Sequence, residues 1–159
     1  MKARWGFGIA ALLLVISGFL LLKWSQDEPR RDSLAALRNL RAALSSNNSE
    51  SLLNAIVLPQ ALRGRTVPEQ VEFLRKALHD EISDEGVAAL KRRGKFGPLN
   101  QVFPEEGGVW AKQAGAKPED CIAFKMERAG IRAEVVLAHE GQTYRVVRCN
   151  NVKQMAGGA

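Results

Sequence analysis

The hydrophobic pattern opens with a stretch of eighteen uncharged residues, Trp5–Leu22, close to the start of the chain. As a helix rising 1.5 Å per residue, this stretch is about 27 Å long, near the roughly 30 Å hydrocarbon thickness of a bilayer. Trp5 and Trp24 fall at the depth of the two headgroup layers, which tryptophan prefers, and basic residues flank the run on both sides. The pattern predicts a transmembrane anchor over residues 1–24.

Two alternatives to this topology stay open. A cleaved secretory signal peptide has a similar polar start and apolar stretch, and Val15 and Ser17 lie at a cleavage spacing. The apolar run continues past that point, which favours an uncleaved anchor. Lys2 and Arg4 favour a cytosolic N-terminus, but Lys23, Arg30 and Arg31 on the other flank mean that the count of basic residues does not favour export. Because a very short N-terminal tail before an early span usually stays inside, we expect a bacterial inner-membrane protein with its domain in the periplasm. A domain in the cytosol is the second alternative.

Helical periodicity governs the middle of the chain. A polar linker over residues 25–32, which contains Pro29, separates it from the anchor. Each expected helix carries an apolar stripe, and Thr66 and Glu69 have the spacing of a capping box. We expect helices that begin near Ser33, Ser49, Thr66, Ser83 and Pro104 and end near Leu44, Val57, Leu78, Gly94 and Gly115.

Apolar and polar residues alternate from Cys121 to Asn150, and Ala129-Gly130 and Glu140-Gly141 mark two turns. This pattern predicts a three-stranded antiparallel meander, followed by a flexible tail over residues 151–159. Because a slip of one residue would move the apolar set to the other face, the pattern also predicts a register. The expected cross-strand pairs are Glu127–Arg132, Phe124–Val135, Ile122–Leu137, Ala138–Thr143, Leu137–Tyr144 and Val135–Val146.

The predicted fold is α+β: an N-terminal transmembrane helix, then several helices packed on one face of the three-stranded sheet, in a single domain over residues 33–150. The opposite face carries two exposed ion pairs, Lys125–Glu134 and Glu127–Arg132. Small apolar residues share that face with them. They indicate either partial cover by another segment or a partner, or ordinary scattered surface residues.

Cys121 begins the first strand of the meander and Cys149 ends the third. Those two strands run parallel to each other, so the two Cα atoms are expected about 20 Å apart at 3.3 Å per residue. A disulfide needs Cα atoms within about 7 Å. We therefore expect no bond between these two thiols.

The formal charge of +6 changes the picture little, because three of the basic residues belong to the anchor. The remainder carries 20 basic and 17 acidic side chains, an excess too mild for a nucleic-acid-binding protein. About 135 residues follow the anchor, enough for one domain with a core and too few for two.

Motifs for catalysis or metal binding are missing from the sequence. His79 and His139 are the only histidines, and neither has His, Cys or carboxylate neighbours at ligand spacing. Glu105 and Glu106 match an acidic helix start better than an acid–base pair. We expect no cofactor, no metal and no enzyme active site, although carboxylates distant in the sequence can meet in a fold.

One local charge anomaly stands out, the basic run Lys91, Arg92, Arg93 and Lys95. On a tethered domain, such a cluster is a candidate contact with a partner or with lipid headgroups. The alternative is that these cations complement the negative end of their own helix.

The element order over residues 33–150, several helices before an antiparallel sheet, resembles that of small cystatin-like (nuclear transport factor 2-like) domains. The resemblance implies a cone-shaped cavity between helices and sheet, used in such domains for ligand binding, catalysis or protein association. Its candidate lining residues here are Phe124, Val135, Tyr144 and Trp110.

The leading functional hypothesis is an accessory domain, anchored in the membrane, that docks on another envelope protein. It depends on the predicted anchor, on the compact domain, on the missing catalytic motifs and on the partly apolar outer face of the sheet. Two alternatives stay open: a small-molecule-binding or enzymatic domain that uses the cavity, and a soluble domain secreted after signal cleavage.

Overall fold

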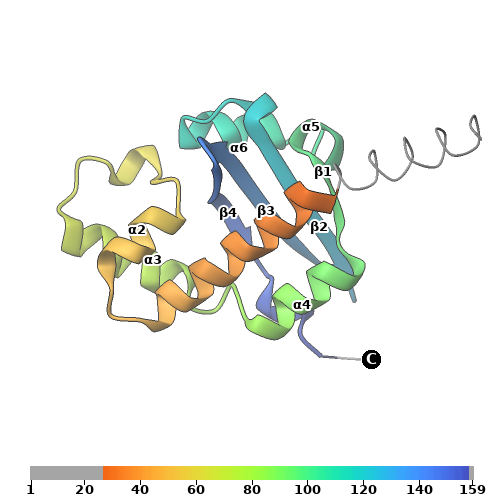
Figure 1. Ribbon diagram of the computed structural model, residues 1–159, viewed down its shortest axis with the longest axis horizontal. Helices are drawn as coiled ribbons and strands as arrows, with labels where there is room; N and C mark the ends of the chain where they lie inside the picture. The colour runs from red at the N-terminus through yellow and green to blue at the C-terminus, as the bar shows by residue number, and fades with distance from the viewer. Residues whose placement is uncertain (1–26, 158–159) are drawn as a thin grey trace, which may run out of the picture. The chain divides into compact units, whose positions relative to one another are not determined.

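The computed structural model describes residues 27–157 of the chain (Figure 1). The predicted span Trp5–Leu22 lies outside these residues. Among the described residues, no helix combines the length and the apolar character that a membrane crossing requires. The chain divides after Asp32 into two units, of which Ser33–Ala159 is the α+β domain.

Residues 27–32, expected as a polar linker, are helical. Within them Arg31 pairs with Glu28 at 3.8 Å and with Asp32 at 3.4 Å. The Glu28 pair has the i,i+3 spacing that supports an exposed helix. The polar composition therefore predicted correctly that this segment is exposed, but it did not predict that the segment is helical.

The helices of the domain begin and end close to the expected residues. The capping box is confirmed: the Thr66 N–H and hydroxyl donate to Glu69 at 2.9 and 2.8 Å. Ser83 accepts from the Gly86 N–H at 3.1 Å, as expected of a cap. The helical segments are residues 33–45 of the helix 27–45, α2 (Ser49–Ala55), η1 (Gln60–Leu62), α3 (Val67–Leu78), α4 (Asp84–Arg93), α5 (Leu99–Val102), α6 (Gly107–Ala114), η2 (Pro118–Asp120) and η3 (Lys153–Met155).

The sheet has four strands rather than the three predicted, in the antiparallel order β1-β2-β3-β4. The added strand pairs with the start of the meander, and it places the ring of Phe96 4.7 Å from that of Phe124. It ends at Pro98, which an edge strand tolerates because no partner needs that N–H. The strands are β1 (Lys95–Pro98), β2 (Cys121–Arg128), β3 (Ile131–Glu140) and β4 (Thr143–Asn150).

The predicted register is confirmed in the first hairpin, where Phe124 faces Val135. The prediction for the second hairpin is wrong: Glu140 faces Thr143, so Ala138 faces Arg145 instead of Thr143. Gly141, at a φ of +66°, lets the chain reverse within two residues, so the hairpin is tighter than expected.

A β-bulge opposite Val136 and Leu137 shifts the register of β4 further. As a result, Leu137 faces Val146 whereas Val135 faces Cys149. The extra residue turns Cys149 toward the face that packs against most of the helices.

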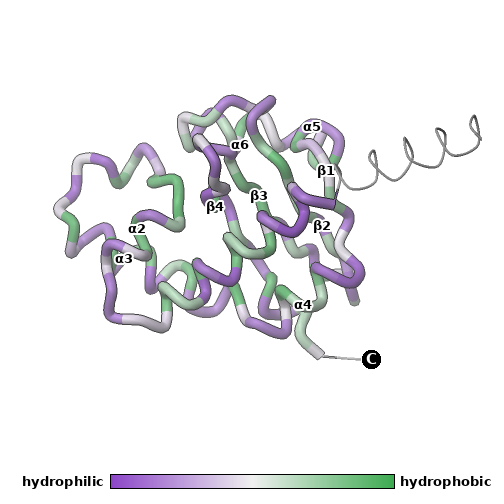
Figure 2. The backbone as a smooth tube through the Cα atoms, viewed as in Figure 1, coloured by the Kyte–Doolittle hydropathy of each residue, from purple (hydrophilic) through white to green (hydrophobic). Residues whose placement is uncertain are grey.

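The main core lies between that face and the helices, and Figure 1 shows residues 33–45 running across the sheet. Figure 2 shows hydrophobic stretches along β2 and β3, the strands that this core packs against. Phe124 and Val135 have no exposed surface. The helices contribute, among others, Leu37, Leu40, Leu52, Leu74 and Leu90.

Helices also cover the second face, so the expectation that they occupy one face alone is wrong. A second core joins α5, α6 and this face, with Leu99, Phe103 and Ala111 packed against Ala123 and Val136. The small apolar residues of the outer face are therefore covered by another segment of the chain, one of the two alternatives left open. The sheet is the middle layer of three.

The expected C-terminal tail packs on the main core. Val152 and Met155 are buried, and the Glu81 carboxylate accepts from the Asn151 N–H at 2.6 Å. A Cβ on Gly86 would lie 2.0 Å from the Val152 carbonyl oxygen, so this close approach requires glycine. The domain therefore extends to residue 157.

Cys121 and Cys149 are free thiols, as expected. Cys121 lies in the second core and Cys149 in the first, so the sheet separates them. Burial raises the pKa of Cys121 to about 11 and that of Cys149 to about 12. Both stay protonated, and hence poorly reactive, at neutral pH.

Candidate interaction surfaces

A basic surface forms where α4, β1 and β2 meet. Arg92 and Arg93 end α4, and Lys95 begins β1. The β1–β2 register places Lys95 directly opposite Lys125, and Arg128 ends the same strand. These five cations are called the basic surface below. The sequence singled out three of them, and strand pairing adds Lys125 and Arg128.

Two neighbouring cavities, of about 450 and 520 Å³, hollow this surface. Arg93, Met126 and Arg128 line both of them. The first adds Lys95, Lys125 and Glu127, and the second adds Glu85, Ala88, Ala89, Arg92, Met155 and Gly157. Lys91 is on the same helical turn but outside both linings. The cavities thus bring five cations and two carboxylates together.

The five cations of the basic surface outnumber the two carboxylates that line its cavities. Within residues 27–157, the ion pairs of the domain involve other arginines and lysines than these five. Like charges directly opposite each other on adjacent strands are destabilising. Lys95 and Lys125 therefore repel each other, although Lys125 also lies 5.9 Å from the Phe103 ring centre and is attracted to Glu106, and the surface is suited to bind an anion.

A second charged cluster surrounds Glu134, which is only 4% exposed. Arg132 donates to one of its carboxylate oxygens at 2.7 Å and Arg148 to the other at 2.9 Å. Arg132 also donates to Glu106, at the start of α6, at 3.1 Å. The predicted pairing of Glu134 with Lys125 as an exposed ion pair is therefore wrong, although the two residues do face each other. The cover of α6, which alternation could not reveal, buries this carboxylate.

Aromatic rings complete the Glu134 cluster. The Arg148 guanidinium lies 4.4 Å from the Trp110 ring centre, and that of Arg132 lies 5.8 Å from Phe103. The hydrogen bond to Glu134 raises the pKa of Arg132. A backbone hydrogen bond lowers the pKa of Glu106 most, and the hydrogen bond from Arg132 lowers it further. Since these groups bind one another, the cluster fixes α6 to the sheet.

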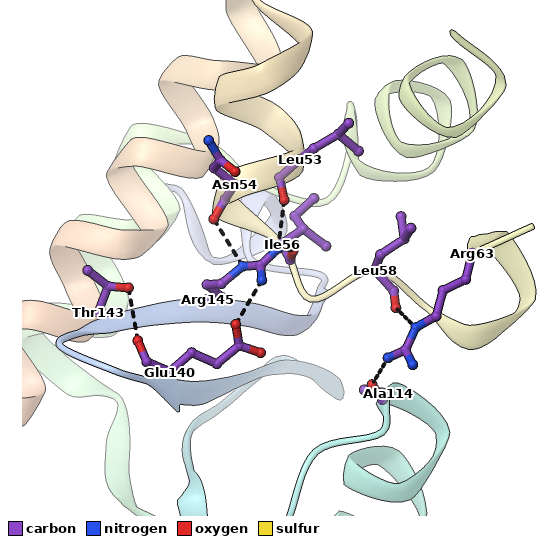
Figure 3. A network of polar contacts seen from close by, with 9 residues as sticks. All are labelled: Leu53, Asn54, Ile56, Leu58, Arg63, Ala114, Glu140, Thr143 and Arg145. Atoms are coloured by element: carbon purple, nitrogen blue, oxygen red, sulfur yellow. Dashed lines mark hydrogen bonds and ion pairs between the residues drawn. The ribbon is translucent and has the colours of Figure 1, made fainter. Parts of the chain in front are cut away.

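Two arginines hold helix ends by binding their last carbonyl groups (Figure 3). Arg145 of β4 reaches the C-terminus of α2 and donates to the carbonyls of Leu53 and Ile56 at 2.8 and 2.5 Å. Arg63 donates to the Ala114 carbonyl at the end of α6 at 2.8 Å. Carbonyls at helix ends lack partners within the helix, and cations complement the negative end of the helix dipole. Arg145 thereby fixes the chain beyond α2 against the edge of the sheet.

The outer edge of β4 borders an apolar groove of about 280 Å³, here called the edge groove. Ile56 forms an isolated parallel bridge with Val146, and the Val57 N–H donates to the Val146 carbonyl at 2.9 Å. Beyond that bridge the chain turns away at Pro59. The groove is lined by Ile56, Pro59, Phe73, Leu74, Ala77, Leu78, Glu81 and residues 146–150.

Phe73 is 48% exposed on the α3 wall of the edge groove. An exposed aromatic side chain beside a strand edge is a feature of protein docking sites. Sequence reasoning missed this site, because Phe73 belongs to a helix whose Val71 and Leu74 point into the core. An aromatic residue outside the apolar stripe of that helix was the available signal.

The four residues expected to line one cavity lie on both sides of the sheet. Phe124 and Val135 are fully buried in the main core, and Tyr144 packs against it. Trp110 lies on the opposite side of the sheet, in the second core. The space between helices and sheet that the resemblance implied is occupied at these positions by side chains.

The histidines lie apart from each other. His79 follows α3 as its C-terminal cap, and His139, expected in a turn, lies on β3 with its ring 4.8 Å from that of Tyr144. In the part of the chain that the structure describes, no three His, Cys, Asp or Glu side chains gather as metal ligands would.

Comparisons with known proteins find no match to this chain among family models, curated proteins or solved structures. The surfaces described above and the sequence pattern of the N-terminal segment are therefore the only indications of function.

Proposed function

We propose that this chain is a membrane-anchored interaction domain that docks on another envelope protein through the edge groove. Residues 1–24 serve as the anchor, with the domain in the periplasm. The exposed Phe73 beside the outer edge of β4 carries the proposal. Its occupant is an extended segment of the partner with apolar side chains, which can add to the sheet as a further strand.

The layering of the domain supports docking at an edge. Helices of the chain itself cover both faces of the sheet, so neither face is left for a partner. β1 and β4 are the edge strands of the sheet. On an edge strand, alternate N–H and C=O groups point away from the sheet and can pair with another chain. The bridge between Ile56 and Val146 is the start of such a pairing, and the groove follows the same strand from Val146 to Asn150.

The competing function, binding of a small molecule between helices and sheet, has less support. Phe124 and Val135, the central candidates for such a site, have no exposed surface. The cavities at the basic surface and the edge groove lie at the periphery of the sheet instead.

Phe73→Glu is expected to abolish partner binding while leaving the fold intact, because the side chain is half exposed. Loss of a central aromatic contact commonly costs about 2 kcal/mol or more, about thirtyfold in affinity. The measurement is quantitative mass spectrometry of proteins that co-purify with the full-length chain in mild detergent. Val67→Glu is the matched control, since Val67 lies on the same helix and is 54% exposed but does not line the groove. An envelope partner retained equally by both variants would refute docking at the groove.

For the anchor, the full-length chain is expected to stay with membranes after an alkaline carbonate wash, because a run of eighteen uncharged, mostly apolar residues holds it in the bilayer. The same chain without residues 1–24 is expected in the supernatant. Fractionation followed by immunoblotting measures both. A full-length chain that washes off, or a mature N-terminus near Gly18, would instead support signal cleavage and a secreted domain.

A further inference from the structure

We infer that the basic surface binds the phosphate groups of anionic phospholipids and holds the domain against the membrane. This contact is separate from the edge groove and leaves it free for a protein partner. The inference uses the proposed anchor only to bring the domain close to lipid. Arg92, Arg93, Lys95, Lys125 and Arg128 are the proposed contacts.

The first argument is that a helix end does not account for this charge. Cations in the last turn of α4 complement its dipole, which explains Arg92 and Arg93. Lys95, Lys125 and Arg128 belong to strands, and the dipole effect falls off within the last helical turn. Lys125 lies 5.9 Å from the centre of the Phe103 ring, a cation–π contact, so the helix dipole and this ring account for only part of the basic surface.

The positions of Lys95 and Lys125 are electrostatically unfavourable. Lys95 and Lys125 face each other across β1 and β2, where like charges repel. Among the described residues neither lysine makes a short ion pair, and attraction to Glu106 and the Phe103 ring offsets only the charge of Lys125. A ligand with negative charge would remove this repulsion, so its binding energy includes the relief of a cost that the fold already carries.

The third argument is the shape of the surface. Two adjoining cavities share Arg93 and Arg128, so each cavity offers more than one cation to an anion within it. Guanidinium groups bind phosphate oxygens in pairs, and lysine contributes a mobile point charge. Met126 gives both cavities an apolar lining beside the cations, which suits a phosphodiester joined to a glycerol backbone.

Lipid fits these observations better than an acidic protein or a nucleic acid. Glu85 and Glu127 interrupt the basic surface, which disfavours the long anionic track of a nucleic acid. The cavities have no exposed aromatic anchor of the kind that protein interfaces use. A tethered domain meets headgroups at high local concentration, so a few cations suffice.

The test uses the full-length chain inserted in nanodiscs, either of neutral phosphatidylcholine or with a third of the lipid replaced by phosphatidylglycerol. Amine-reactive labelling, read by mass spectrometry, measures the accessibility of single lysines. In anionic discs, Lys95 and Lys125 are expected to label several-fold more slowly, whereas the exposed Lys112 of α6 keeps its rate. Raising the salt to 1 M, where the Debye length falls to about 3 Å, should restore labelling.

The variant Arg93→Gln/Arg128→Gln removes the two cations that both cavities share. Each basic residue near an anionic bilayer contributes about fivefold in affinity, so this variant should bind about 25-fold more weakly and lose the protection of Lys95 and Lys125. The control Arg38→Gln/Arg65→Gln removes the same charge from exposed positions outside both cavities. This control should keep the protection of Lys95 and Lys125.

Three outcomes overturn the inference. Protection that includes Lys112 equally would show unspecific attraction of the whole domain. Protection by inorganic phosphate in neutral discs, without any in anionic discs, would assign the surface to a soluble anion. Equal labelling in both kinds of disc would show no phosphate site. Failure of the chain to insert into either disc would refute the anchor, and the labelling is then repeated with vesicles added to the chain.

Discussion

Val135→Asp is expected to unfold the domain. Val135 lies in the middle of β3 without exposed surface, between Phe124 on one neighbouring strand and Cys149 on the other. An aspartate there would be a buried carboxylate without a partner, which costs several kcal/mol. A domain of this size is stable by only about 5–15 kcal/mol. Urea denaturation followed by circular dichroism should show the loss of most or all of the cooperative transition.

Val109→Asp is the control for this prediction. Val109 lies on α6 and is 55% exposed, so the same change of residue type meets water instead of the core. Its unfolding midpoint should stay close to that of the unsubstituted chain. Equal losses in both variants would mean that β3 does not place Val135 in the main core.

The alternating pattern predicted the first hairpin correctly because both of its strands present a continuous apolar set to the main core. Phe124 opposite Val135 is the only register that keeps this set together. The second hairpin lacked such a constraint, since Val146 fits the core against either of two partners on β3. The tight turn at Gly141 and the bulge then decided the register. Local backbone geometry of this kind leaves little trace in hydropathy.

The second core was harder to foresee. Ala123, Val136 and Ala138 are small, and small apolar residues occur on exposed faces as often as under a helix. Their cover by α5 and α6 brings together segments far apart in the sequence. The same distance hid part of the basic surface, because Lys125 meets Lys95 only through the β1–β2 pairing. For the basic surface, the sequence therefore predicted the residues that are adjacent in the chain but not those that are adjacent only in space.

Glu134→Ala is expected to destabilise the domain substantially, contrary to the small effect that an exposed ion pair with Lys125 would predict. Glu134 is buried and accepts hydrogen bonds from Arg132 and Arg148 at 2.7 and 2.9 Å. Its removal leaves two guanidinium groups close together without their shared counter-ion. Breaking a buried ion pair costs about 3–5 kcal/mol. Because the two arginine side chains are 38% and 37% exposed, water compensates part of this, and we expect about 2–3 kcal/mol.

Three further variants isolate the role of the Glu134 carboxylate. Glu127→Ala removes an exposed carboxylate from β2 and should change the free energy of unfolding by less than about 0.5 kcal/mol. Glu134→Gln keeps the size of the side chain but not its charge, so it should recover only part of the loss. Adding Arg148→Ala to Glu134→Ala should cost less than the sum of the two single changes, because the second removes a cation that the first has already left without its partner. Additive losses, or a Glu134→Ala variant as stable as Glu127→Ala, would mean that the carboxylate does not join the two arginines beneath α6.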